Sequence, residues 1–344
     1  MVEKQEETNL IGLTRSEYLG ERSTLCPGCG HNTISAQILR SCYELGIHPS
    51  DIVKFSGIGC SSKSITYILS QSFGFNGLHG RMPSMALGAA FGNTQMKVIG
   101  VSGDGDTASI GLGQFKHLIR RNLPMVYIVE NNGVYGLTKG QFSATAEKGL
   151  VLRHQGTNPF LPIDIAKEAL TSNASFVARS FAGDPDQVRS LIKAALSHRG
   201  TAVLDIISPC VSFHNLENTI HSYSWGRQNE SPLHDITYFP AHEEIILDEF
   251  KEGEIKEVTL HDGSIIVLKK LENDYDPTDK WQALKILEEA DQQRWLITGL
   301  VYINPNQPTL YDNLNIVEEP FNRIPKEKLR PSPESLDVIN QRLY

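Results

Sequence analysis

The sequence lacks both an excess of positive charge and any long hydrophobic run. Its 344 residues carry 40 acidic and 32 basic side chains, a formal net charge of −8, which argues against a nucleic-acid-binding protein. No apolar stretch approaches the roughly 20 residues that a membrane-spanning helix needs. The N-terminal segment MVEKQEETNLIG is polar and acidic, unlike a secretory leader, so we expect a cytoplasmic protein.

Cysteine is also scarce, because the chain has only five, an odd number that does not suit a disulfide scaffold. Cys42 lies in an amphipathic stretch and is predicted to be a buried apolar residue. The pair Cys26 and Cys29 suits a redox dithiol, a structural zinc site or an iron–sulfur cluster. Zinc usually takes a second close pair, which is absent, and a redox pair leaves Cys60 and Cys210 unexplained. Four thiolates are the number that a [4Fe–4S] cluster needs, but spacing alone leaves the three interpretations open.

Short apolar, β-branched runs do alternate with helical patterns through the first 210 residues. This alternation predicts an α/β protein with a parallel sheet, which binds ligands beyond the carboxyl ends of its strands. We expect an N-terminal arm over residues 1–20, an α/β domain over 21–240 and a C-terminal extension over 241–344. The predicted strands are 51–57, 97–102, 125–130, 176–181 and 202–208, and the predicted helices are 33–45, 84–95, 111–121 and 186–198. The extension is predicted to contain a hairpin at 257–268, a helix at 281–292 and a proline-rich tail.

Polar residues follow two successive predicted strands. The run GDGD at 103–106 follows one strand and precedes a helix, and Asn131-Asn132 follows the next strand. Because these strand ends meet at one sheet edge, Asp104 and Asn132 would offer the oxygen ligands that Mg²⁺ takes together with phosphate. Glycines at 103 and 105 allow a diphosphate to approach the backbone. Either motif alone would suit a helix cap or a turn, but the two together favour a diphosphate–magnesium site.

Five motifs occur in order: CPGCGH at 26–31, GIGCSSK at 57–63, HGR at 79–81, GDGD at 103–106 and NNGVYGLTKGQ at 131–141. GDG with the double asparagine looks like the diphosphate-binding signature of thiamine diphosphate enzymes. The ordered set, over residues from about 20 to 240, resembles the β subunit of the 2-oxoacid:ferredoxin oxidoreductases. The long tail is most similar to the 2-oxoglutarate type. The resemblance implies a parallel-sheet thiamine diphosphate-binding fold with a C-terminal extension.

The resemblance also implies cofactors and their ligands. A [4Fe–4S] cluster would be held by Cys26, Cys29, Cys60 and Cys210. Mg²⁺ would be held by Asp104, Asn132 and the main-chain carbonyl of Val134. Lys63 and Lys139 would meet the 2-oxoacid carboxylate or coenzyme A phosphates, and His79 would lie near the diphosphate or aminopyrimidine. Thiamine diphosphate would be bordered by Gly57, Ile58, Gly59, Cys60, Ser61, Ser62, His79, Gly103, Asp104, Gly105, Asp106, Asn132, Val134, Gly136, Leu137 and Thr138.

The implied activity is coenzyme A-dependent oxidative decarboxylation of a 2-oxoacid, with electrons passing through the cluster to ferredoxin. 2-Oxoglutarate, giving succinyl-CoA and CO₂, is the favoured substrate, and the direction of the reaction stays open. The glutamate that activates the cofactor has no candidate in this sequence, and in the family it comes from an α subunit. We therefore expect a heterodimer or a dimer of heterodimers, with the tail on the partner, and no nucleic-acid or membrane partner.

Structural roles compete with these chemical ones. His79 could be a loop histidine held for structure, Asp106 a helix cap, and Lys63 and Lys139 solvated lysines. His31 is expected to belong only to the helix start. For the whole chain, the alternatives are a cluster-free thiamine diphosphate-dependent decarboxylase or synthase, a pyruvate-type substrate, and a non-catalytic dithiol or zinc-binding protein.

Overall fold

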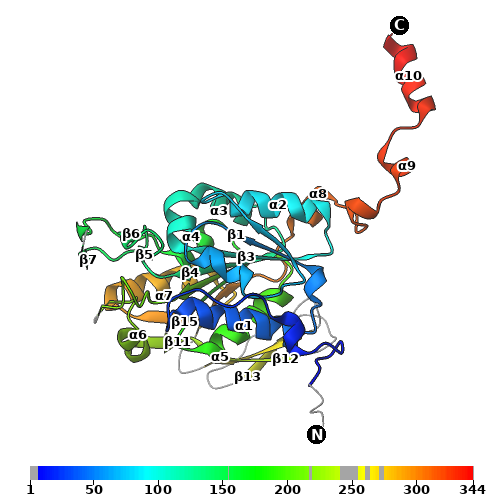
Figure 1. The fold of residues 1–344 in the computed structure, drawn as a ribbon. Coiled ribbons are helices and arrows are strands. Elements are labelled where there is room, and N and C mark those ends of the chain that lie inside the picture. Colours follow the sequence, from blue (N-terminus) through cyan, green and yellow to red (C-terminus); the bar gives the residue numbers. More distant parts are fainter. Residues whose placement is uncertain are drawn as a thin grey trace.

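Eight strands form the central sheet of the computed structural model, which describes residues 7–153, 155–216, 219–240, 255–259, 264–270 and 275–343. The strand order is β11-β15-β9-β10-β4-β3-β1-β2 (Figure 1). All neighbours pair in parallel except β15 and β9, which are antiparallel. The predicted α/β class is therefore confirmed, and two strands that were not predicted, β11 and β15, run opposite to the other six. The bounds are β1 (Ile52–Ser56), β2 (Phe73–Asn76), β3 (Lys97–Gly103), β4 (Met125–Asn131), β9 (Phe176–Phe181), β10 (Thr201–Ile207), β11 (Glu230–Pro232) and β15 (Leu296–Ile303).

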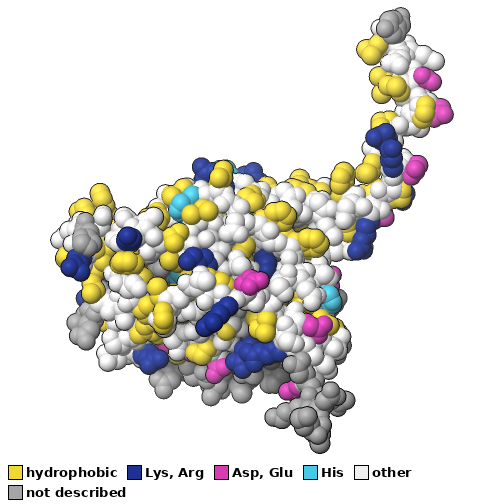
Figure 2. All heavy atoms as spheres, in the orientation of Figure 1, with side chains coloured by type: hydrophobic (Ala, Val, Ile, Leu, Met, Phe, Trp, Pro, Cys, Tyr) yellow, Lys and Arg dark blue, Asp and Glu magenta, His cyan; other side chains and the backbone are white. Residues whose placement is uncertain are grey.

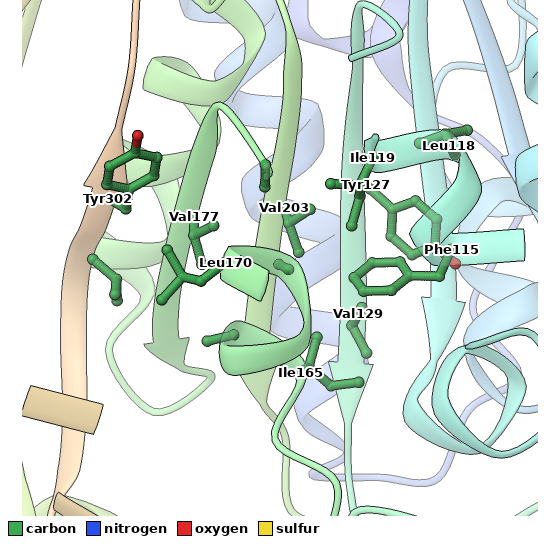
Figure 3. Packing of buried hydrophobic residues seen from close by; sticks show 14 of the residues in the cluster. Phe115, Leu118, Ile119, Tyr127, Val129, Ile165, Leu170, Val177, Val203 and Tyr302 are labelled. Carbon is green, nitrogen blue, oxygen red and sulfur yellow. The ribbon is translucent and has the colours of Figure 1, made fainter. Parts of the chain in front are cut away.

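Helices cover both faces of this sheet. On one face lie α1 (Gly30–Glu44) and α5 (Pro185–Ser197). On the other lie α2 (Met82–Gly92), α3 (Leu112–Ile119), α4 (Ile165–Thr171) and α7 (Lys280–Gln293). Successive strand side chains point to opposite faces, so both faces of a covered strand must be apolar. In β4, Ile128 packs toward α1 and α5, while Tyr127 and Val129 pack under α3 and α4 (Figure 3).

Shorter elements complete the described chain. The predicted hairpin is confirmed by antiparallel β13 (Ile255–Thr259) and β14 (Ser264–Lys270), although its turn, 260–263, lies outside the described residues. The other elements are η1 (Arg15–Tyr18), η2 (Pro49–Asp51), η3 (Ser61–Thr66), η4 (Gly105–Ile110), β5 (Val134–Tyr135), β6 (Gln141–Phe142), β7 (Val151–Leu152), β8 (Gly156–Thr157), α6 (Tyr223–Asn229), β12 (His234–Pro240), α8 (Leu310–Leu314), η5 (Phe321–Arg323), α9 (Lys326–Leu329) and α10 (Pro333–Leu343).

Strand β15 ties the predicted C-terminal extension to the main sheet. The helix predicted at 281–292 is confirmed as α7, which ends at Arg294 in a left-handed conformation (φ 56°). The chain then reverses and lays β15, all of it buried, between β9 and β11. The division predicted between residues 240 and 241 therefore runs through this sheet.

The C-terminal arm, α9 and α10, projects away from the rest of the structure (Figure 1). Neither helix has a buried residue, and Leu336, Val338, Ile339 and Leu343 of α10 are each at least half exposed. Their apolar side chains stand out on the arm in Figure 2. Among the described residues, no helix has the length and apolar character needed to cross a membrane.

A buried ion cluster joins β9, β10 and the start of α4, and it generates a test of stability. Arg179 donates to Asp205 at 3.0 Å and to Asp164 at 2.5 Å. Burial would raise the pKa of Asp164, but the Arg179 charge holds it below its usual range. Arg179→Met leaves the buried Asp205 carboxylate without its cation, so we expect the free energy of unfolding to fall by about 3–5 kcal/mol in urea titrations.

The matched control is Lys285→Met, because Lys285 pairs with Glu289 on an exposed face of α7. It should change the free energy of unfolding by less than about 1 kcal/mol. Equal effects of the two substitutions would contradict the role assigned to the buried cluster.

Candidate cofactor site

A cavity of about 110 Å³ lies beyond the carboxyl ends of β1, β3 and β4. Such an edge is where open α/β sheets bind ligands. Predicted residues that line it are Ile58, Gly59, Cys60, Ser61, His79, Gly103, Asp104, Gly105, Asp106, Asn132, Val134, Gly136, Leu137 and Thr138. The structure thus brings most of the predicted cofactor-binding residues together. Gly57, Ser62, Lys63 and Lys139 lie outside this lining.

A second cavity, of about 260 Å³, lies at the opposite edge of the sheet. It is bordered by the first residues of β3 and β4, Lys97 and Met125, and by Arg199 after α5. None of the predicted site residues lines it. The smaller cavity is therefore the candidate site.

Asp104 and Asn132 stand side by side at the rim of the cofactor cavity. The backbone N–H of Asn132 donates to Asp104 Oδ1 at 3.3 Å, and the hydroxyls of Ser143 and Thr145 donate to Asp104 Oδ2. Burial raises the pKa of Asp104, although these hydrogen bonds oppose the shift. Within the described residues, no cationic side chain pairs with this carboxylate. A divalent cation at the rim would supply the missing positive charge, so these oxygen ligands suit Mg²⁺.

Asp106 joins three loops around the cavity. It lies in η4, a π-helical turn, and its Oδ1 accepts from the backbone N–H of Ile58 (3.1 Å) and Gly80 (2.8 Å). The same oxygen contacts Nδ1 of His79. A Cβ on Gly57 would lie 1.8 Å from Asp106 Oδ2, so only glycine fits there. Asp106 therefore does more than cap a helix, because it fixes the positions of both loops and of His79.

The turn after Asn132 brings the rim formed by Asp104 and Asn132 close to the cysteines. Its backbone needs Gly133 at φ 72°, and the N–H of Val134 donates to Asn132 Oδ1 at 3.0 Å. A Cβ on Gly136 would lie only 3.4 Å from Cys60 Sγ and 3.6 Å from Cys210 Sγ. Two of the predicted cluster ligands therefore pack against the same turn that would hold the diphosphate.

The four predicted cluster cysteines share one region. Burial raises the pKa of Cys29 to about 12, and the charges of Glu130, Cys210 and Cys60 add to the shift. Burial also raises the pKa of Cys60, helped by Cys210 and Cys26 and opposed by Lys63. Bound iron would relieve these costs by stabilising the thiolates. Cys42 is fully buried in α1, which confirms its prediction as a core residue.

The cysteines are not arranged around a single point. Among the described residues, no three His, Cys, Asp or Glu side chains stand close enough to share one metal ion. The thiolates of a four-iron cluster each bind a different iron, so they stand further apart than the ligands of one ion.

Three lining residues were not predicted: His31, Glu130 and Tyr135. Nδ1 of His31 lies 2.8 Å from the Ser208 hydroxyl, and burial lowers the pKa of His31 to about 4. His31 does lie in the first turn of α1, as expected, and it also lines the cavity. Glu130 is fully buried and accepts the Ser64 hydroxyl at 3.0 Å, and burial raises its pKa well above the usual range. The sequence signal for Glu130 was a carboxylate at the end of an apolar strand.

Comparison with known protein families supports a thiamine diphosphate-binding protein. Residues 57–206 match the family model of the thiamine pyrophosphate enzyme, C-terminal TPP binding domain. Residues 267–319 match the family model of the C-terminal part of the pyruvate ferredoxin oxidoreductase β chain. The fold and the site thus define an α/β protein with a thiamine diphosphate-binding domain.

Individual relatives narrow this class. The chain is 40% identical over 193 residues to the 2-oxoacid:ferredoxin oxidoreductase β subunit of Saccharolobus solfataricus (56% of this chain, 63% of that one). It is 39% identical over 194 residues to the 2-oxoglutarate oxidoreductase subunit KorB of Mycobacterium tuberculosis (55% and 51%). It is 34% identical over 225 residues to the 2-oxoglutarate synthase subunit KorB of Methanothermobacter thermautotrophicus (64% and 76%). The chain belongs to the 2-oxoacid:ferredoxin oxidoreductase β-subunit family, as its motifs predicted.

A solved structure extends the similarity over the whole chain. The 2-oxoglutarate:ferredoxin oxidoreductase of Magnetococcus marinus, with 2-oxoglutarate, coenzyme A and succinyl-CoA bound, has a TM-score of 0.74 and 28% identity, covering 99% of both chains. The matched segment nevertheless spans only 63% and 51% of the first two relatives named above.

The contact between Gly57 and Asp106 gives a testable consequence. Gly57→Ala places a methyl group on the Asp106 carboxylate, so the loops at 57–63 and 79–81 must shift. We expect a loss of about 1–3 kcal/mol in stability and weaker thiamine diphosphate binding, measured by urea unfolding and by calorimetry. Gly113→Ala is the control, because a Cβ there meets nothing within 4 Å in α3 and should stabilise the helix by up to about 1 kcal/mol. Equal thiamine diphosphate affinity in the two variants would contradict the role of Asp106.

Proposed function

We propose that the chain is the β subunit of an enzyme that oxidatively decarboxylates a 2-oxoacid with coenzyme A and passes the electrons through a [4Fe–4S] cluster to ferredoxin. The observation that carries this proposal is the shared turn at 131–138. Asn132 of this turn stands beside Asp104, and Gly136 of the same turn lies against Cys60 and Cys210. A thiamine diphosphate site and an electron carrier would thus be immediate neighbours.

The chain's own residues suit both Mg²⁺-bound thiamine diphosphate and the iron–sulfur cluster. Asp104, Asn132 and the Val134 carbonyl would hold Mg²⁺, and Cys26, Cys29, Cys60 and Cys210 would hold the cluster. When bound, thiamine diphosphate would supply the carbanion chemistry and the cluster one-electron transfer. Asp106 would keep His79 at the cavity mouth, where the imidazole side chain is 33% exposed. The apolar side chains of Ile58 and Leu137 would help to exclude water from the cofactor.

Two lysines beside the site would serve the anionic substrates. Lys63 is partly buried, and its positive charge lowers the pKa of Cys60 against the effect of burial. Lys139 is exposed on the 131–141 turn, where its φ is 77°. A non-glycine residue in this left-handed conformation carries a backbone cost, which suits a functional position. We propose that these ammonium groups meet the 2-oxoacid carboxylate or the coenzyme A phosphates. 2-Oxoglutarate is the favoured 2-oxoacid, because relatives of that type are among those matched over most of their length.

An assay of the assembled enzyme tests the function. The chain is co-expressed anaerobically with its α subunit and supplied with coenzyme A, a viologen dye and each 2-oxoacid in turn. We expect 2-oxoglutarate-dependent dye reduction and about four irons per β chain. Cys210→Ser should lose most of the iron and the activity, whereas Cys42→Ala, which removes a thiol from the core of α1, should retain both. Full iron content in Cys210→Ser, or thiamine diphosphate-dependent decarboxylation without iron, would favour the cluster-free alternative.

The C-terminal arm is proposed to pack on the α subunit. Its apolar side chains on α10 are exposed and need a partner to leave water. Deleting residues 325–344 should leave the midpoint of thermal unfolding of the isolated chain unchanged, because neither α9 nor α10 has a buried residue. The same deletion should weaken association with α at least tenfold in sedimentation experiments, and unchanged association would rule out this contact.

A further inference from the structure

The segment after β10 links a predicted cluster ligand to the predicted magnesium turn. Backbone hydrogen bonds run in both directions between Cys210 and His214, at 3.1 Å and 2.9 Å. The His214 ring is fully buried, and its Nδ1 lies 2.9 Å from the main-chain oxygen of Asn132. Cys210 and Asn132 are therefore joined through one residue, His214.

A second histidine of the same segment holds the neighbouring asparagine. Nε2 of the fully buried His221 lies 3.1 Å from Oδ1 of Asn131. The other side-chain atom of that amide, Nδ2, donates to Asp205 at 2.9 Å. The orientation of the Asn131 side chain is therefore fixed from both sides.

Both rings also pack on the turn itself. A Cβ on Gly133 would lie 2.8 Å from the His214 ring and 3.1 Å from the His221 ring, and the two ring centroids are 4.8 Å apart. Each ring nitrogen that faces an asparagine oxygen must carry a proton in order to donate. The remaining nitrogens, His214 Nε2 and His221 Nδ1, are buried with no hydrogen-bond partner among the described residues. Apolar side chains would avoid that cost in a purely structural role, so the donated hydrogen bonds account for histidine at both positions.

We propose that His214 and His221 are positioning residues that couple the cluster to the magnesium–diphosphate site. A cluster that fixes Cys210 also fixes the backbone of His214, and the His214 ring then holds the Asn132 turn in its ligating position. This inference rests on the proposed function. Because energetic coupling between two sites is reciprocal, each cofactor strengthens the binding of the other.

The intervening chain makes this coupling effective. Between Cys210 and His214, the side chains of Val211 and Phe213 are more than one third exposed, so few buried contacts hold this stretch. Without a cluster, the segment depends on its hydrogen bonds, and local opening costs little in such regions. Opening withdraws the donor to Asn132 and loosens the turn.

The test measures Mg²⁺-dependent thiamine diphosphate binding by calorimetry in the anaerobic αβ enzyme, with the cluster present and after its removal by a chelator. Removal from the unmodified enzyme should weaken binding about 10- to 100-fold, the range for lost outer-shell partners of metal ligands. His214→Leu and His221→Leu should bind weakly in both states, so the effect of removing the cluster shrinks. His214→Asn and His221→Gln place an amide N–H near the lost ring donor and should restore most of the effect. His117→Leu, on an exposed position of α3, is the control.

Several results would overturn the inference. One is equal affinity with and without the cluster, and another is an undiminished effect of cluster removal in His214→Leu. If the leucine variants do not fold, amide hydrogen exchange is measured in the unmodified enzyme instead. Removing the cluster should speed exchange at residues 132–134. Unchanged exchange rates would refute the coupling. A preparation with neither iron nor thiamine diphosphate binding would instead refute the proposed function.

Discussion

Parallel pairing of β1, β3, β4 and β10 is the constraint on which the site depends. It places four strand ends at one edge, so residues 57–63, 103–106, 131–138 and 208–214 meet although they lie far apart in the chain. The glycines at these ends let backbone and carboxylates approach closely, as Gly57 does at Asp106. The helices on the two faces supply the apolar burial that makes this arrangement rigid.

The buried acids of the Arg179 ion cluster and those of the cofactor cavity differ in whether a cationic side chain pairs with them. In the ion cluster, Asp164 and Asp205 both pair with Arg179, which holds the pKa of Asp164 below its usual range, although burial still raises the pKa of Asp205. At the site, Asp104 has only hydroxyl and amide donors, and the pKa values of Asp104 and Glu130 are raised by burial. Uncompensated buried acids are costly and belong where a bound group changes the balance. The same logic applies to the thiols of Cys29 and Cys60, whose pKa values are also raised by burial.

The two regions are connected through Asn131. Its amide donates to Asp205 of the buried ion cluster and accepts from His221, while the adjacent Asn132 meets Asp104. Strand β10 supplies Asp205 and, just beyond its end, the segment that carries Cys210. The hydrogen bonds of the site are thus connected to those of the packed sheet. The proposed coupling between the cofactors acts through these same contacts.

Local signals, namely the apolar runs and the polar motifs at strand ends, were enough to predict the α/β class, five strands near their observed ends, and the residues GDGD and Asn132 that line the cavity. The sequence analysis missed β2, β11 and β15, and the place of β15 in the sheet depends on a chain reversal at Arg294 and on burial against β9. Only the tertiary structure showed that His31 and Glu130 border the cavity and that His214 and His221 hold the asparagine turn. No spacing rule predicts these contacts, since they join residues 66 to 177 positions apart that meet only after the sheet has closed.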